Sequence, residues 1–334
     1  MPVRVGVIGV GVMGAEHARL LSREVAGSEV SAVFDVNPAR ASEVAASSGA
    51  QVWDDPMVLV KDESVDAVVV ASSDPTHEQF VLDALTAAKP VLCEKPLAPD
   101  VAGCVRILDA EVELGRRLVS VGFMRRYDQG YRALKDVLDG GRLGRAVMLH
   151  CTHRNASVTP GLESSLLISG SAVHEIDIAR WLLGEELVAV TVHTPRRGAG
   201  ADGTQDPLFL VLESAGGVLV DVEVFANAGY GYDVRAELVA DHGTVSLDSP
   251  PPTAVRSEGG VARVVPADWR GRFGEAYRRE LQDWVTNVEA GTLPATASAW
   301  DGYVATEVAQ VGIRALETGQ RQAVELREKP ALYT

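Results

Sequence analysis

The sequence lacks several features that would place it in a special class of protein. It has 3 cysteines, Cys93, Cys104 and Cys151, and their spacing matches no metal site, so we expect reduced thiols in the core of a cytosolic protein. No apolar stretch reaches the roughly 18 residues that a membrane span needs. No signal-peptide pattern precedes the apolar run that starts at Val3, which also favours a cytoplasmic location.

Basic residues are scarce relative to acidic ones. The 31 Lys and Arg against 46 Asp and Glu give a formal net charge of −15, which argues against nucleic acid or an anionic membrane as a partner. The hydrophobic content of 46% is ordinary for a globular protein, and 334 residues suffice for two domains with separate cores. We therefore expect a protein of two domains, whose charge says little about a neutral substrate.

The strongest motif in the sequence is a set of three glycines near its start. The β-branched run 3–8 leads into Gly9-x-Gly11-x-x-Gly14, and an amphipathic helix pattern follows. In this strand–turn–helix context Gly9 allows the tight turn, Gly11 lets a pyrophosphate approach, and Gly14 lets the helix lie close to the strand. The alternative is a plain βαβ unit without a dinucleotide, because glycine-rich turns are common.

Asp35 supports the dinucleotide interpretation. It ends the second predicted strand, at a distance from Gly14 where an acidic side chain binds the ribose hydroxyls. A carboxylate there favours NAD over NADP, because it would repel a 2′-phosphate. Arg40 lies close by in sequence and keeps NADP open as an alternative.

Strands and helices alternate up to about residue 121, which predicts a doubly wound parallel sheet. Ligands bind at the carboxyl ends of such strands. We therefore assign these further residues to the cofactor site: Val12, Met13, Arg40, Ser72, Pro75, His77, Glu94 and Lys95.

The pattern changes after Gly122, where helices become sparse and strands lengthen. We predict strands at 146–154, 187–195, 207–214, 217–226, 232–241 and 243–248, helices at 172–183, 272–290 and 297–318, and surface loops at 198–203 and 249–252. Alternating valines predict a mostly antiparallel sheet with one exposed face. The fold class is α/β, with an NAD-binding Rossmann domain at 1–123 and a substrate-binding and oligomerisation α+β domain with a large open sheet at 124–334.

Two segments carry candidate catalytic groups. Lys95, in Glu94-Lys95-Pro96, follows the fifth predicted strand, although a plain surface lysine is the alternative. His174 shares a helix face with Asp177 and could act as a general base near neutral pH. The alternative is a core histidine held by the carboxylate of its own helix. We expect no metal site, because His153, His174 and Asp177 lack a convincing further ligand.

Together these motifs resemble the Gfo/Idh/MocA oxidoreductase family, and within it the branch of bacterial inositol 2-dehydrogenases. The resemblance covers essentially the whole chain. It rests on Gly9–Gly14, Asp35, Glu94–Pro96, Phe123–Asp128, His153–Asn155, Val173–Asp177, Tyr230–Asp233, Trp300–Tyr303 and Glu328–Tyr333.

The resemblance implies an NAD-dependent enzyme, usually a homotetramer built sheet to sheet, that takes a hydride from C2 of myo-inositol. It implies that Lys95 and His174 carry proton transfer. It further implies a polyol substrate bound by residues at these positions: Met124, Arg125, Asn155, Gly170, Ser171, Asp177 and Tyr232.

One position departs from the family pattern. The family has an aspartate four residues before the histidine, and this chain has Gly170. The change removes a charge and leaves space, which points to another cyclitol, an aminocyclitol or a pyranose sugar as alternative substrates. Asp177 is the candidate to substitute in part as the group that orients His174. A catalytically silent NAD-binding regulatory protein is the alternative of a different class.

Overall fold

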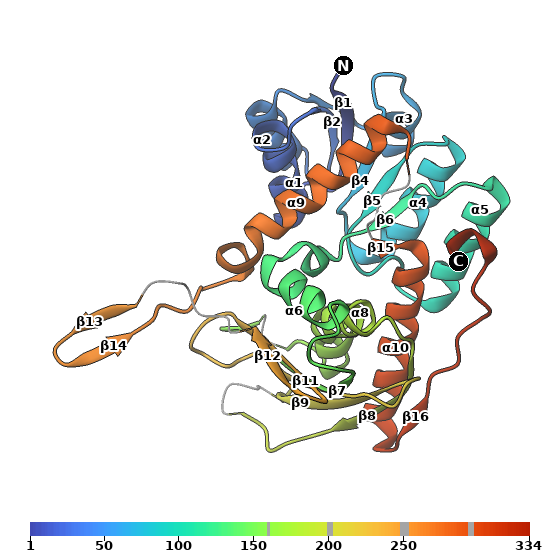
Figure 1. Ribbon diagram of the computed structural model, residues 1–334. Coiled ribbons are helices and arrows are strands. Elements are labelled where there is room, and N and C mark those ends of the chain that lie inside the picture. Colours follow the sequence, from blue (N-terminus) through green and yellow to red (C-terminus); the bar gives the residue numbers. More distant parts are fainter. Residues whose placement is uncertain (159–160, 199–202, 248–253, 293–296) are drawn as a thin grey trace. The chain divides into compact units, whose positions relative to one another are not determined.

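The computed structural model describes residues 1–158, 161–198, 203–247, 254–292 and 297–334 (Figure 1). They form two compact units. The first contains Met1–Met124, Ala276–Thr306 and Arg327–Thr334, and the second contains Arg125–Glu275 and Glu307–Leu326. No helix in the described ranges is both long enough and apolar enough to span a membrane.

The first unit is built on a seven-stranded sheet with the strand order β15-β6-β5-β4-β1-β2-β3 (Figure 1). Its strands are β1 Val3–Ile8, β2 Ser28–Phe34, β3 Gln51–Val52, β4 Ala67–Val70, β5 Val91–Cys93, β6 Val119–Val121 and β15 Ala297–Ser298. Strands β1 to β6 pair in parallel, and β15 is antiparallel to β6. This order confirms the doubly wound sheet, and it reverses between β1 and β4, where such sheets bind ligands.

Helices connect these strands because the sequence supplies their caps. The side chains of Asn37, Asp55 and Asp100 each accept a backbone N–H in the first turn of the helix that they precede. The helices of this unit are α1 Val12–Arg23, α2 Pro38–Ser48, α3 Pro56–Lys61, η1 Asp74–Thr76, α4 His77–Thr86, α5 Val101–Leu114 and η4 Ala331–Tyr333. Two longer helices, α9 Trp269–Ala290 and α10 Ala299–Thr318, are divided between the units.

The second unit contains a seven-stranded sheet with the order β12-β11-β7-β10-β9-β8-β16. Its strands are β7 Ala146–Arg154, β8 Leu187–His193, β9 Leu208–Ser214, β10 Leu219–Phe225, β11 Asp233–Ala240, β12 Gly243–Leu247 and β16 Gln322–Ala323. Only β7 and β10 pair in parallel among the described strands of this sheet. Val220, Val222 and Val224 of β10 are fully buried on one face, which confirms the predicted alternation.

The remaining elements of the second unit are η2 Met124–Tyr127, whose first residue belongs to the first unit, α6 Gln129–Asp139, α7 Ser164–Leu166, η3 Leu167–Ala172, α8 Val173–Leu183, and the hairpin β13 Val255–Ser257 with β14 Gly260–Ala262. The hairpin was not predicted. The predicted loop at 249–252 lies outside the described residues, and of the loop at 198–203 only the two ends are described.

Two late segments of the chain pack with the first unit, which a single boundary near residue 123 does not anticipate. Residues 297 and 298, predicted as the start of a helix, form β15 at the edge of the first sheet. At the end of the chain, the Tyr333 hydroxyl donates to Oε2 of the buried Glu111 at 2.5 Å. The first unit is therefore discontinuous in sequence.

Candidate active site

A cavity of about 430 Å³ lies at the carboxyl ends of β1, β2 and β4 in the first unit. It is lined by Gly9, Gly11, Val12, Met13, Phe34, Asp35, Val36, Arg40, Ala71, Ser72, Ser73, Thr76 and Phe80. Seven of the predicted cofactor residues are among them: Gly9, Gly11, Val12, Met13, Asp35, Arg40 and Ser72. The cavity stands where the strand order reverses, as expected for a dinucleotide site.

The three glycines of the β1–α1 turn meet different surroundings. Gly9 has φ +81°, and a Cβ there would lie 2.4 Å from the Ser72 Cα. A Cβ at Gly14 would lie 1.8 Å from the Gly9 carbonyl oxygen, so the helix could not pack as it does. At Gly11 the nearest atom to a Cβ is Nη1 of Arg40 at 3.8 Å. The backbone at Gly11 is therefore open, as a bound pyrophosphate requires.

Asp35 is fixed at the mouth of this cavity. Its Oδ2 accepts the Val10 N–H at 2.8 Å, and its Oδ1 accepts the Asn37 N–H at 2.8 Å. Each carboxylate oxygen keeps a second lone pair that can accept a ribose hydroxyl. The residues present fit the adenosine ribose of NAD.

His77 and Glu94 do not line the cavity and instead hold the loop that carries Lys95. The His77 ring nitrogens lie 2.7 Å from the Pro96 carbonyl oxygen and 3.1 Å from that of Ser72. Oε1 of the buried Glu94 lies 2.7 Å from Nε2 of His17, and Oε2 accepts the Lys95 N–H at 3.3 Å.

The Glu94 carboxyl stays ionised in this buried place. Burial raises the pKa of Glu94, but the hydrogen bond and charge of His17 outweigh it, so the net shift is downward. Lys95 itself is half-buried after β5, and the Lys95–Pro96 peptide bond is cis. Gly14 and Pro75 also lie outside the cavity lining, so the roles of all five residues remain predictions.

His17 is a supporting residue that sequence reasoning missed. It is fully buried on α1, on the face that also buries Gly14, Ala18 and Leu21. A histidine on the apolar stripe of a helix that starts at the glycine motif was the available signal. Its partner Glu94 is 77 residues away, which no local pattern reveals.

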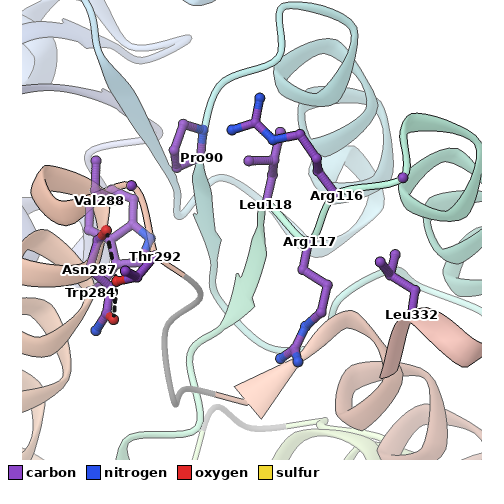
Figure 2. A pocket seen from close by; sticks show the side chains of 11 residues that line it. Pro90, Arg116, Arg117, Leu118, Trp284, Asn287, Val288, Thr292 and Leu332 are labelled. Carbon is purple, nitrogen blue, oxygen red and sulfur yellow. Dashed lines mark hydrogen bonds between the residues drawn. The ribbon is translucent and has the colours of Figure 1, made fainter. Parts of the chain in front are cut away.

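A second cavity of the first unit, of about 310 Å³, lies at the other ends of the strands of this sheet. Figure 2 shows the residues that line it. Pro90 and Leu118, which line it, precede β5 and β6, so it stands at the amino ends of these strands. Arg116, Arg117 and the α9 residues around Asn287 form other parts of its wall. It contains no glycine-rich turn, and ligands of doubly wound sheets bind at the carboxyl ends. We therefore assign the cofactor to the other cavity.

In the second unit, His174 is buried at the start of α8, directly after a π-helical segment. That segment is η3, and short π-helical stretches occur frequently at functional sites. It contains Gly170, which is exposed and where a Cβ would meet no atom within 4 Å. The prediction that residue 170 stands one α-helical turn before His174 needs correction, because the wider turn changes its direction relative to His174. Space is open at Gly170, and its use by a substrate stays a prediction.

The His153 ring lies beside His174, and Tyr232 lies on the far end of that contact, against His153. The His153 ring of β7 lies 6.3 Å from the His174 ring, and Tyr232 lies 5.8 Å from His153, edge to face. Asn155 follows two residues after His153, directly after the end of β7. It is half-buried, and no described residue hydrogen-bonds its side-chain amide. These groups offer donors and acceptors to a polyol.

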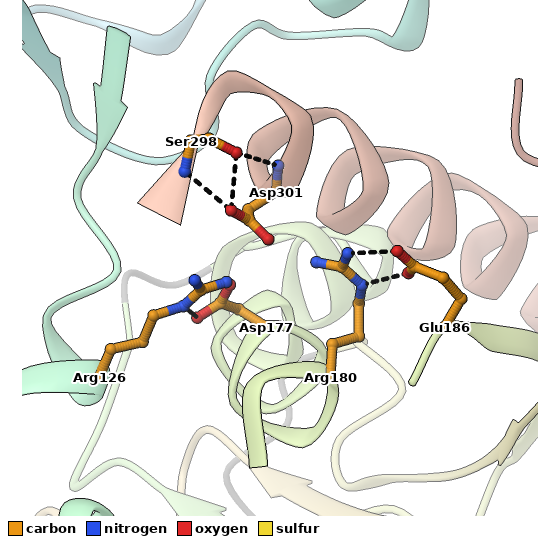
Figure 3. Close-up of polar contacts among 6 residues, drawn as sticks. All are labelled: Arg126, Asp177, Arg180, Glu186, Ser298 and Asp301. Carbon is orange, nitrogen blue, oxygen red and sulfur yellow. Dashed lines mark hydrogen bonds and ion pairs between the residues drawn. The ribbon is translucent and has the colours of Figure 1, made fainter. Parts of the chain in front are cut away.

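The other predicted substrate residues lie in varied places. Asp177 is buried, and Arg126 donates from Nε to its Oδ2 at 3.0 Å and from Nη2 to its Oδ1 at 2.5 Å (Figure 3). This pairing gives no support to Asp177 as the group that orients His174. Arg125 is buried against Glu175, Met124 is buried in the first unit, and Ser171 is half-buried in η3. Their contacts with a substrate remain predictions.

The three cysteines are buried free thiols, which confirms the prediction of core thiols. Burial raises the pKa of Cys104 to about 12, and it also raises the pKa of Cys93 and Cys151. No group of three or more His, Cys, Asp or Glu side chains in the described ranges is arranged to hold a metal ion.

Comparisons with known proteins agree along the chain. Residues 3–123 match a family described as an oxidoreductase family with an NAD-binding Rossmann fold, and residues 131–246 match the GFO/IDH/MocA C-terminal domain. Inositol 2-dehydrogenase 2 of Saccharopolyspora erythraea is 53% identical over 100% of this chain and 98% of its own length. Inositol 2-dehydrogenase of Streptomyces avermitilis is 50% identical over 98% of this chain and 96% of its own length.

Among solved structures, myo-inositol dehydrogenase from Lactobacillus casei, in complex with NAD(H) and myo-inositol, has a TM-score of 0.96. It is 34% identical, and the match covers all of both chains. The glycine-rich turn, Asp35 and these matches lead to one conclusion: the chain belongs to the Gfo/Idh/MocA oxidoreductase family, and its first unit is an NAD-binding Rossmann domain.

Proposed function

We propose that the chain is an NAD-dependent dehydrogenase that oxidises a secondary ring alcohol of an inositol to the ketone. The observation that carries this proposal is the full-length similarity, at 53% identity, to an inositol 2-dehydrogenase. The cavity with Asp35 at its mouth and the polar surroundings of His174 support it.

In this reaction the alcohol carbon loses a hydride and its oxygen loses a proton. NAD supplies the hydride acceptor when it is bound. We assign proton transfer to Lys95 and His174, the two positions that the family resemblance marks for it, and an imidazole can accept a proton near neutral pH. Asn155 and Tyr232 bind other hydroxyl groups of the ring, since each buried hydroxyl needs a partner.

A spectrophotometric screen tests this proposal. The purified protein is mixed with NAD and with a panel of inositols, aminocyclitols and pyranose sugars, and NADH absorbance is followed. We expect reduction of NAD with myo-inositol or a close isomer. No reduction with any member of the panel, together with tight NAD binding by calorimetry, would instead support a catalytically silent NAD-binding protein.

A second candidate substrate class is favoured by one observation, the open space at Gly170. A cyclitol with a larger or cationic substituent, such as an aminocyclitol, could occupy volume that an aspartate fills in the family pattern. In the same screen this candidate predicts a higher kcat/KM for an aminocyclitol than for myo-inositol.

We also infer that the protein is a cytoplasmic homotetramer associated through the sheet of the second unit. One face of this sheet is only half-buried in a single chain and carries ion pairs, such as Arg154 with Glu223 and Arg321 with Glu213. Light scattering coupled to size exclusion measures the mass directly. A monomeric mass at micromolar concentration would contradict the inference.

A further inference from the structure

The residue next to His174 belongs to a buried ion pair. Glu175 is 0% exposed and Arg125 is 1% exposed, and Nη1 of Arg125 donates to Oε1 of Glu175. Nδ1 of His153 lies 3.1 Å from the other carboxylate oxygen, Oε2, and 3.2 Å from Nη2 of Arg125. Three side chains from three segments therefore meet in one buried contact.

The chemistry of these groups determines the protonation of the histidine. A carboxylate only accepts hydrogen bonds and a guanidinium only donates them. Within the described residues, Oε2 of Glu175 accepts from no group other than His153, whereas Arg125 already donates to Oε1. The arrangement that satisfies Oε2 is a His153 ring that carries its proton on Nδ1, and the 3.2 Å approach of Nη2 of Arg125 to that nitrogen is then no hydrogen bond, because both atoms are donors. In the neutral ring, Nε2 is then an acceptor.

The carboxylate in this contact is ionised. Burial raises the pKa of Glu175, but the charges of Arg125 and His153 and their hydrogen bonds outweigh it and bring the pKa to about 2. The rings of Phe273 and Tyr131 lie 5.5 Å and 6.0 Å from the guanidinium carbon of Arg125. The pair is thus closed from solvent by aromatic side chains.

The Arg125–Glu175 pair also acts on Tyr232 and His153. Burial raises the pKa of the Tyr232 phenol, while the nearby Arg125 charge and hydrogen bond act to lower it. His153 stacks edge to face on Tyr232 and lies beside His174. One ion pair therefore holds His153, which lies beside the proposed base, and acts on Tyr232, which packs against His153.

Stability alone does not account for this arrangement. A buried ion pair often gives no net stabilisation over well-packed apolar side chains of similar volume, because both charges lose their hydration. We propose that Glu175 is a positioning residue for the reaction. Through Arg125 and Nδ1 of His153 it fixes the His153 ring beside His174 and against Tyr232, without touching the substrate itself. This inference rests on the proposed function.

Two variants test it against a purely structural role. Glu175→Gln removes the negative charge, so the buried Arg125 guanidinium loses its counter-ion. Arg125→Met combined with Glu175→Leu removes both charges and the hydrogen bond to His153. We expect the double variant to recover the Tm that the single variant loses. Its kcat/KM should stay about 100-fold below wild type, because His153 is no longer held in place. NAD affinity, measured by fluorescence, stays within about twofold of wild type, because the pair does not belong to the first unit.

A matched control uses another ion pair of the same helix. Arg180 of α8 donates from Nε to Oε2 of Glu186 at 2.6 Å and from Nη2 to Oε1 at 2.8 Å (Figure 3). Arg180→Met combined with Glu186→Leu is expected to leave kcat/KM unchanged within about twofold. Recovery of both Tm and kcat/KM in the Arg125 and Glu175 double variant would overturn the positioning role.

A crystal structure of the double variant separates this inference from the proposed function. If wild type oxidises no cyclitol in the screen, the proposed function fails, but the positioning claim is still decided by the ring of His153. We expect that ring to rotate or shift away from its place beside Tyr232. A ring that stays in the wild-type position would overturn the inference even if the variant is inactive.

Discussion

At the scale of single residues, Asp35 gives the most specific prediction about the cofactor. Both of its oxygens are anchored by backbone N–H groups, so the carboxylate cannot swing away from a 2′-phosphate. We predict a strong preference for NAD over NADP. Asp35→Ala should weaken NAD binding and reduce the difference in affinity between NAD and NADP. Calorimetric titration with both dinucleotides measures this. Equal use of NADP by the wild-type protein would show that Asp35 does not select the cofactor.

A second prediction at this scale concerns proton transfer by Lys95 and His174. Lys95→Ala and His174→Ala should each lower kcat by about 10²–10⁴-fold, the usual contribution of a general acid or base. NAD should still bind, because both side chains are assigned to the alcohol proton. Steady-state kinetics and NAD titration are measured on the same preparations. A variant with a near-normal rate would reassign that residue to a structural role.

Residue-level prediction works where function imposes a spacing and fails where the partner is far along the chain. That Gly9, Gly11 and Asp35 line one cavity was predictable, because one strand, one turn and one helix separate them by a fixed number of residues. Glu175 was not, since its partner Arg125 lies 50 residues away and its burial follows from packing. In a helix sequence, a buried carboxylate and a solvated one look alike.

At the scale of elements, the β1–α1 turn allows a test with a matched pair of substitutions. A Cβ at Gly14 would collide with the Gly9 carbonyl oxygen, whereas a Cβ at Gly11 meets only Arg40 at ordinary contact distance. Gly14→Ala should therefore lower Tm, and Gly11→Ala should keep Tm but weaken NAD binding. Thermal unfolding with and without NAD distinguishes the two. Similar Tm losses in both variants would contradict the separate roles.

The π-helical η3 makes residue 170 a test of substrate choice. Gly170→Asp should fold, because its side chain meets open space. If the protein is a weakened inositol dehydrogenase, kcat/KM for myo-inositol should rise about tenfold or more, since a hydrogen bond to a charged group contributes roughly 1.5–3 kcal/mol. If it prefers another cyclitol, activity on that substrate should fall. No change with any substrate would place residue 170 outside the site.

Element-level prediction followed the strength of the periodic signal. The long strands of the second sheet alternate apolar and polar residues, and their predicted bounds agree with the structure within about two residues. The two-residue strands β15 and β16 and the hairpin β13–β14 are too short to show a period. The π-helical turn was also missed, because its wider hydrogen-bond pattern has no distinctive residue signature.

At the scale of the whole molecule, the end of the chain is part of the first unit. Glu111 is fully buried, accepts the N–H groups of Leu118 and Val119, and receives the Tyr333 hydroxyl. Removal of residues 327–334 should lower Tm, because it exposes apolar surface and takes away one donor from a buried carboxyl. Differential scanning calorimetry measures the loss. A truncated protein with unchanged Tm would show that this segment adds no stability.

The discontinuity of the first unit also has a consequence for synthesis on the ribosome. Domains usually fold as units while the chain emerges, starting from the N-terminus. Here the glycine-rich turn emerges first, but β15 and Tyr333, which complete the same unit, are translated after nearly the whole second unit. A nascent chain stopped before residue 327 leaves Glu111 without the Tyr333 hydroxyl. The nucleotide-binding unit is therefore complete only after residues 327–334 have been synthesised.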